Sequence, residues 1–115
     1  MKQVEPQALW PSCEDWVPAL LGYTPEEIAD RFGICFERGL DDLDEYDLAA
    51  LDGGAIGQVW LFRHLRSPKP WTEIQVDFAI PREEALRTVR NLMGLAPDDF
   101  AWVSEFEHAP DAART

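Results

Sequence analysis

The sequence predicts an α+β domain: a mostly antiparallel sheet of four to five strands with helices packed on it, ending in a strand–helix–strand unit. Three observations support this prediction. Apolar and polar residues alternate over 74–80, as in a half-buried strand. Two segments, 24–33 and 81–94, carry helix caps around apolar stripes. The chain is 46 % hydrophobic, which is enough for a packed core in 115 residues.

A single domain is expected to span 1–115, since no repeat and no low-complexity linker divides the chain. Residues 1–12 form an extended lead-in in this interpretation, because prolines interrupt them and no apolar run is present. Trp10 is expected to fix part of this lead-in to the body of the domain. The tail, 109–115, is expected to be frayed.

The first helix signal is weak and the second is strong. Ser12, with an acid three residues later, indicates a helix start, and Pro18 would keep that helix short. Thr24 and Glu27 have the spacing of a capping box, and Gly33 is the expected C′ residue. The sequence therefore predicts a well-capped helix just before Gly33.

The longest predicted helix begins at Pro81, runs to about residue 93 and is ended by Gly94. Its apolar residues fall on one continuous face: Ala85, Leu86, Val89, Leu92 and Met93. We expect this face to pack on the sheet.

Five strands are predicted: one starting at Ile34, then Tyr46–Ala50, Ile56–Leu65, Ile74–Ile80 and Phe100–Phe106. Asp52-Gly53-Gly54 is expected to be a hairpin turn, since glycine tolerates the backbone angles of such turns. The run Val59–Phe62 is apolar on both faces, which predicts a central strand covered on each side. The last helix would connect two parallel strands.

The net charge of the chain limits the kinds of partner that we expect it to bind. The chain has 22 acidic and 10 basic residues, a net charge of −12. A surplus of this size steers cationic partners toward the protein and repels nucleic acid. Aromatic residues make up 11 % of the chain, so it is not a disordered acidic segment.

The densest acidic run is the predicted site of partner binding. It contains Asp41, Asp42, Asp44, Glu45 and Asp47. Loops on a rigid scaffold are where binding residues gather, and we expect this run to engage a basic protein surface with Trp71 as an apolar anchor nearby. The run does not match a calcium-binding EF-hand, because its twelfth position counted from Asp42 is Gly53 rather than glutamate. A looser magnesium site from Asp41, Asp44 and Asp47 stays open, but no metal or cofactor is predicted.

Motifs for catalysis are not found in the sequence. His64 and His108 do not have the spacing of zinc ligands, and Cys13 and Cys35 have no local partner motif of a nucleophile. Two cysteines in a small chain without an apolar leader favour free thiols and a cytoplasmic location. We therefore expect a cytoplasmic binding protein rather than an enzyme.

Residues 71–106 suggest a family. Thr72–Asp77 leads through Ile80-Pro81-Arg82-Glu83 into a helix, and Asp98–Val103 follows with Trp102 in the last strand. This order resembles the small immunity proteins of bacterial polymorphic toxin systems. The resemblance implies an inhibitor that covers the active site of a cognate basic toxin domain, such as an enzyme that attacks nucleic acid, and it carries over no binding residue.

Two other functions stay open at this point. A small enzyme or ligand-binding domain would place a pocket between sheet and helices, with acids as general bases. An acidic regulatory subunit, or a mimic of nucleic acid, would dock on a larger basic assembly.

Overall fold

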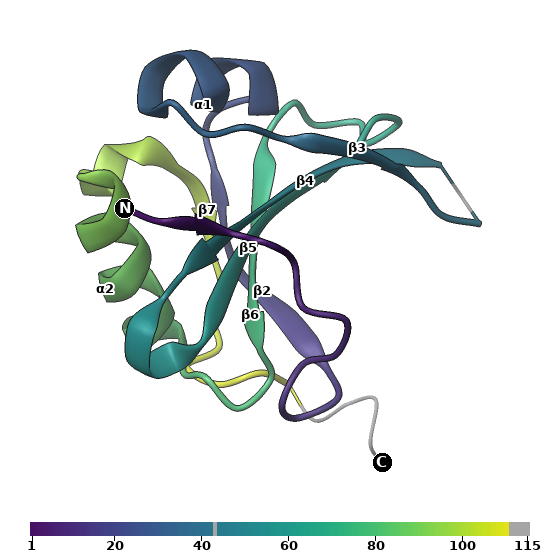
Figure 1. Ribbon diagram of the computed structural model, residues 1–115. Coiled ribbons are helices and arrows are strands. Elements are labelled where there is room, and N and C mark those ends of the chain that lie inside the picture. The colour runs from purple at the N-terminus through teal and green to yellow at the C-terminus, as the bar shows by residue number, and fades with distance from the viewer. Residues whose placement is uncertain (43, 111–115) are drawn as a thin grey trace.

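The computed structural model describes residues 1–42 and 44–110, and within them the chain forms seven strands and two α-helices (Figure 1). The strands are β1 (Gln3–Val4), β2 (Asp15–Leu21), β3 (Glu37–Leu40), β4 (Glu45–Asp52), β5 (Gln58–His64), β6 (Thr72–Asp77) and β7 (Phe100–Val103). The helices are α1 (Pro25–Phe32) and α2 (Arg82–Met93), with short 3₁₀ turns at Gly54–Ile56 and Pro97–Asp99. The α+β class is as predicted.

All strands belong to one sheet in the order β1-β4-β5-β6-β2-β7, and β3 also pairs with β4. Every pair is antiparallel. β1 and β3 share the outer edge of β4, where they pair with Ala50–Leu51 and with Glu45–Leu48 respectively. The described sheet is larger than predicted, because the lead-in and the following segment also contribute strands.

The segment after Ser12 is a strand, so the predicted short helix there is wrong. β2 pairs with β6 on one side and with β7 on the other, and these two ladders outweigh a weak local helix signal. Pro18 lies where the register with β6 shifts, between Trp16 and Ala19. A proline at such an irregularity removes no regular ladder hydrogen bond.

The chain ends in the predicted strand–helix–strand unit, β6–α2–β7. β2 lies between β6 and β7 and is antiparallel to both, so β6 and β7 run in the same direction, as expected, without touching as neighbours. Arg82, at the start of α2, holds the segment that follows β7. Its backbone N–H donates to the Glu107 carbonyl, and its side chain donates to the Ser104 carbonyl at 2.9 Å.

Both helices cover the same face of the sheet. Thr24 and Glu27 form the predicted capping box of α1, and Gly33 ends that helix at a φ of +70°. The core on this face contains Ile28 of α1 and Ala85, Val89 and Met93 of α2. Leu86 and Leu92 pack against it as half-buried residues, which confirms the predicted apolar face of α2.

β5 is central, as predicted, but helices cover only one of its faces. Val59 and Leu61 are fully buried under the helices, whereas Trp60 and Phe62 point to the opposite face and are half-buried. The lead-in covers part of that second face: Trp10 is buried, with its ring centroid 4.8 Å from that of Trp60. The lead-in also reaches Asp77 through Ser12, and Gln75 is buried, whereas Tyr46, Phe62 and His64 are only half-buried at the other end of this face.

Ala109 packs against the core, and the predicted frayed tail beyond Pro110 lies outside the described residues. Among the described residues, no helix has the length and apolar character needed to cross a bilayer.

Candidate protein-binding face

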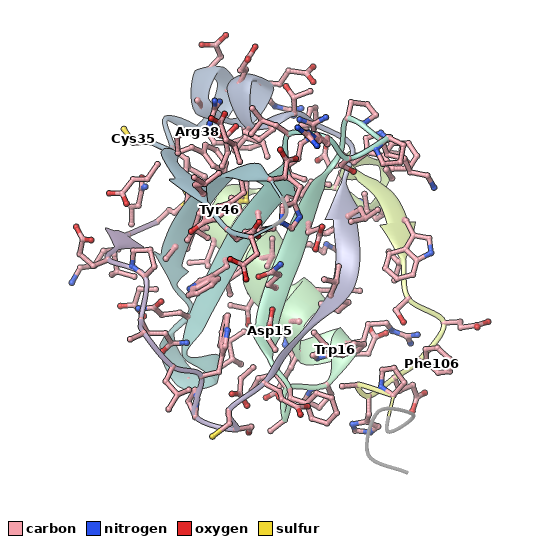
Figure 2. The ribbon with its side chains drawn as sticks, turned by 90° about the vertical axis from the view of Figure 1, so that its right-hand side faces the viewer. Asp15, Trp16, Cys35, Arg38, Tyr46 and Phe106 are labelled. Carbon is pink, nitrogen blue, oxygen red and sulfur yellow. The ribbon has the colours of Figure 1, made fainter. Side chains whose placement is uncertain are left out.

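The face of the sheet opposite the helices carries the candidate site. Side chains alternate along a strand, so Ala49, Leu61 and Ile74 lie side by side under the helices while their chain neighbours point the other way. Figure 2 looks onto that second face, with α2 behind the sheet and Tyr46 and Asp15 in front of it. We call this second face the open face.

Three aromatic side chains form a cluster at one end of the open face. Tyr46 of β4 lies opposite His64 of β5, and Phe62 is two residues before His64 on the same side of that strand. The rings of Tyr46 and Phe62 are stacked with centroids 5.0 Å apart, and those of Phe62 and His64 meet edge-on at 4.8 Å. All three residues are half-buried, so the cluster (Tyr46, Phe62 and His64) is a packed aromatic surface that solvent still reaches.

The β3–β4 hairpin holds the acidic run beside this aromatic cluster. His64 Nε2 lies 2.8 Å from Asp41 Oδ2, which ties the hairpin end to β5. The Arg66 N–H donates to Asp44, and the Arg66 guanidinium is 3.5 Å from the same carboxylate. A hollow of about 330 Å³ opens between the two elements, lined by Asp44, His64, Arg66, Ser67 and Glu73.

The five predicted binding acids form two groups: Asp41, Asp44 and Asp47 make close contacts within the chain, whereas Asp42 and Glu45 are held less closely by the described residues. Asp41 and Asp44 hold the hairpin end, and Asp47 accepts from Arg38 Nε at 2.8 Å with only 16 % of the Asp47 side chain exposed. Glu45 is 55 % exposed and contacts Arg38 at 3.4 Å. Asp42 is exposed, and no hydrogen bond or ion pair of Asp42 with another described residue is present.

The acidic run therefore carries countercharges that the sequence prediction did not include. Arg38 is paired with Asp47 by the register of β3 and β4, and Arg66 comes from the loop after β5. These two arginines leave three of the five negative charges unbalanced. Glu45 lies on the same side of β4 as Asp47 and Ala49, away from Tyr46, so Asp42 is the acid of the run best placed to meet a partner at the open face.

Trp71 lies just before β6, on the loop that follows Arg66. It is half-buried, and the ammonium of Lys69 stands 5.2 Å from its ring centroid. A cation at this distance interacts favourably with an aromatic ring. Trp71 thus has a partner within the chain, and the aromatic cluster on β4 and β5 is a stronger candidate for the apolar anchor.

A second pair of acids on the open face was missed by the sequence analysis. Asp15 of β2 lies opposite Asp77 of β6. Burial by itself would raise the pKa of Asp77, but hydrogen bonds from the Ser12 N–H at 2.8 Å, the Ser12 hydroxyl at 2.7 Å and the Ala79 N–H at 3.0 Å outweigh it and lower that pKa. The two acids are 62 positions apart in the chain, and no local pattern joins them.

Asp15 has the opposite shift. Although Asp15 as a whole is exposed, its carboxyl is partly covered; this burial raises the pKa, and the charges of Asp77 and Glu14 raise it further. A raised pKa is a feature of general bases, but the hollow beside His64 does not include Asp15. Asp15 therefore adds negative charge to the open face, and its carboxylate takes up a proton at a higher pH than that of an ordinary aspartate.

In the described part of the chain, the candidate metal ligands and the two cysteines do not come together in one site. Among the described residues, no three side chains of histidine, cysteine, aspartate or glutamate are grouped as metal ligands. The carboxylates of Asp41 and Asp47 point to His64 and Arg38 respectively. Cys13 and Cys35 are exposed and are not joined to one another.

Comparisons of the chain with protein-family models, with curated proteins and with solved structures found no match.

Proposed function

We propose that this chain is a binding protein that engages the basic surface of a partner protein with its open face. The observation that carries the proposal is the aromatic cluster of Tyr46, Phe62 and His64 with acids around it. Protein interfaces concentrate their binding energy in central aromatic residues inside a polar rim.

The charges around the aromatic cluster indicate which kind of partner suits the open face. Glu73 lies opposite Phe62 on the open face, Asp41 contacts His64, and Asp42 follows Asp41 at the hairpin end, so negative charge borders the aromatic cluster. The net charge of −12 adds to this local charge. Arginine and lysine side chains can pair with these carboxylates and also stack on the rings of Tyr46 and Phe62. The open face is therefore suited to a partner rich in arginine and lysine.

The finer proposal follows from the resemblance to immunity proteins. In it, the partner is a basic toxin domain, and the open face inhibits that domain by covering its active site. An acidic inhibitor of this kind would associate rapidly with a basic substrate groove, because complementary charge accelerates encounter.

The experiment begins by identifying what touches the open face. A photo-crosslinking amino acid replaces Phe62 in one variant and Thr88, on α2, in a matched control, and both are expressed in the native host. The proposal expects a basic protein crosslinked from position 62 and not from position 88. A partner captured equally from both positions would place the contact elsewhere.

Kinetics with the purified partner then test the role of charge. The pair Asp42→Asn and Glu73→Gln removes charge beside the aromatic cluster and should slow association roughly three- to tenfold and flatten its dependence on salt. The control pair Glu26→Gln and Asp30→Asn removes the same charge from exposed positions of α1 and should have a much smaller effect. Equal effects of the two pairs would mean that only net charge matters, and that the acids beside the aromatic cluster have no specific role.

Inhibition is tested separately in cells. Expression of the partner alone should arrest growth, co-expression of this chain should restore it, and the variant Phe62→Asp should fail to do so. A partner that is harmless when expressed alone would contradict the toxin assignment while leaving the binding face intact.

A further inference from the structure

A groove runs along the opposite edge of the sheet, between β7 and α2. It has a volume of about 510 Å³, and its lining includes Leu86, Arg87, Arg90, Leu95, Phe100 and Val103. These residues come from the helix-covered side of the domain, so the groove is separate from the open face. Its floor is apolar and its helical rim is cationic.

The strand that forms one wall of the groove has a free edge. β7 is the last strand in the sheet order and pairs with β2 alone among the described strands. Its exposed residues are apolar: Val103 is 41 % exposed and Trp102 is 45 % exposed. Such an edge offers unpaired backbone N–H and C=O groups to another extended chain.

The cationic rim is unusual in this acidic protein. Most other arginines have partners: Arg31 pairs with Asp99, Arg38 with Asp47, Arg66 with Asp44 and Arg82 with Glu83. Arg87 and Arg90 are exposed, and their guanidinium groups form no hydrogen bond or ion pair with another residue in the described part of the chain. Glu83, which also lines the groove, is neutralised by Arg82 at 2.8 Å.

We propose that this groove binds an extended acidic–apolar segment of a protein, which adds to β7 as a further strand. Its backbone would pair with the free edge of β7, its aliphatic side chains would cover Leu86, Phe100 and Val103, and its carboxylates would pair with Arg87 and Arg90. The free edge, the apolar floor and the cationic rim each require a different part of this ligand, and one extended segment satisfies all three.

The spacing of the two arginines fits such a ligand. Residues three apart on a helix are separated by about 4.5 Å along its axis. Side chains on one face of an extended peptide repeat at about 6.6 Å, and the length of an arginine side chain spans the difference. Two acids at alternate positions of the ligand therefore meet Arg87 and Arg90 together. This ligand has the opposite charge to the partner of the open face, so the chain would join two different proteins.

The probe is a fluorescein-labelled octapeptide, Thr-Leu-Thr-Asp-Thr-Asp-Thr-Leu, whose symmetric pattern presents the same side chains whether it runs parallel or antiparallel to β7. Fluorescence anisotropy should show saturable binding to the full chain. The double variant Arg87→Glu and Arg90→Glu should weaken binding by at least about tenfold. The control pair Lys2→Glu and Lys69→Glu makes the same change of charge away from the groove and should leave the affinity within about twofold.

N-methylation of the peptide tests the strand pairing itself. Backbone N–H groups of alternate residues point to the same edge of a strand. Methylation of one alternate set should abolish binding, and methylation of the other set should be tolerated. Equal loss with both sets, equal binding of a peptide with lysine in place of aspartate, or no saturable binding below about 1 mM would each overturn the proposal. Sedimentation of the chain alone gives a further test, because a dimer that Arg87→Glu and Arg90→Glu dissociate would make a second copy the occupant of the groove.

Discussion

Tyr46 of β4 lies over Gly39, its cross-strand partner in β3, so closely that a β-carbon at position 39 would overlap the tyrosine ring. The absence of a side chain at Gly39 is what lets this ring lie flat and stack on Phe62. The geometry of the aromatic cluster thus depends on a residue of the acidic hairpin that bears no functional group.

Gly39→Ala tests this dependence. The added methyl group should displace the Tyr46 ring and cost about 1–3 kcal/mol of stability, as overpacking does. Proton NMR should show changed ring-current shifts of Phe62 and His64, and affinity for the partner should fall. Gly22→Ala is the control, since a β-carbon there would meet its nearest atom, the Asp99 carbonyl oxygen, at an ordinary 3.4 Å. An unshifted Phe62 spectrum in Gly39→Ala would show that the ring is not held by this contact.

Val89→Asp tests the packing of α2. Val89 is fully buried between α2 and the sheet, so an aspartate there would leave a buried charge without a partner and cost about 3–5 kcal/mol. Arg87→Asp places the same residue in the exposed middle of the same helix, and it should cost about 0.5–1 kcal/mol through helix propensity alone. Chemical denaturation measures both. Similar losses in the two variants would mean that the buried face of α2 is assigned incorrectly.

Asp15→Asn should stabilise the protein in a pH-dependent way. Because the pKa of Asp15 is raised on folding, its ionised form is disfavoured in the folded state. The asparagine variant should therefore melt at a higher temperature near pH 7. The gain should shrink as the pH falls through the raised pKa and vanish below the ordinary value, where Asp15 is protonated whether folded or unfolded. A gain that does not change with pH would assign the effect to packing rather than charge.

Ser12 and Asp77 should show coupled effects of the opposite sign. Since the pKa of Asp77 is lowered on folding, its ionised form stabilises the domain above the ordinary pKa, and this contribution is lost as the pH falls toward the lowered one. A double-mutant cycle of Ser12→Ala and Asp77→Asn should give a coupling of about 1–3 kcal/mol near pH 7. The coupling should decrease in acid. Strict additivity at neutral pH would show that the hydrogen bond from the Ser12 hydroxyl to Asp77 contributes nothing beyond each residue alone.

Local signals predicted the helices and most strands of this fold. The capping box of α1 and the apolar face of α2 are complete within short stretches of chain, and the alternation over β6 needs only neighbouring residues. The strand β2 was predicted wrongly because its evidence is not local. Its hydrogen-bonding partners are β6 and β7, which follow much later in the chain, and Pro18 gives a misleading signal by itself.

The candidate site shows the same division. The sequence correctly indicated where negative charge concentrates, but not that Arg38 and Arg66 neutralise part of it, because strand register and loop position decide those pairs. It also showed that Val59–Phe62 is apolar in every position, but not that Trp60 and Phe62 would face away from the helices.

What the sequence by itself determined is composition and short-range order: net charge, helix caps, and the alternation of apolar residues that selects an α+β domain. What only the tertiary structure decided is which side chains meet. Tyr46 meets Gly39 and Phe62, Asp15 meets Asp77, and Arg87 and Arg90 of α2 line one groove with Phe100 and Val103 of β7. Contacts of this kind depend on strand order and register, which are fixed by the combined packing of the whole core and leave no mark on any single segment of the chain.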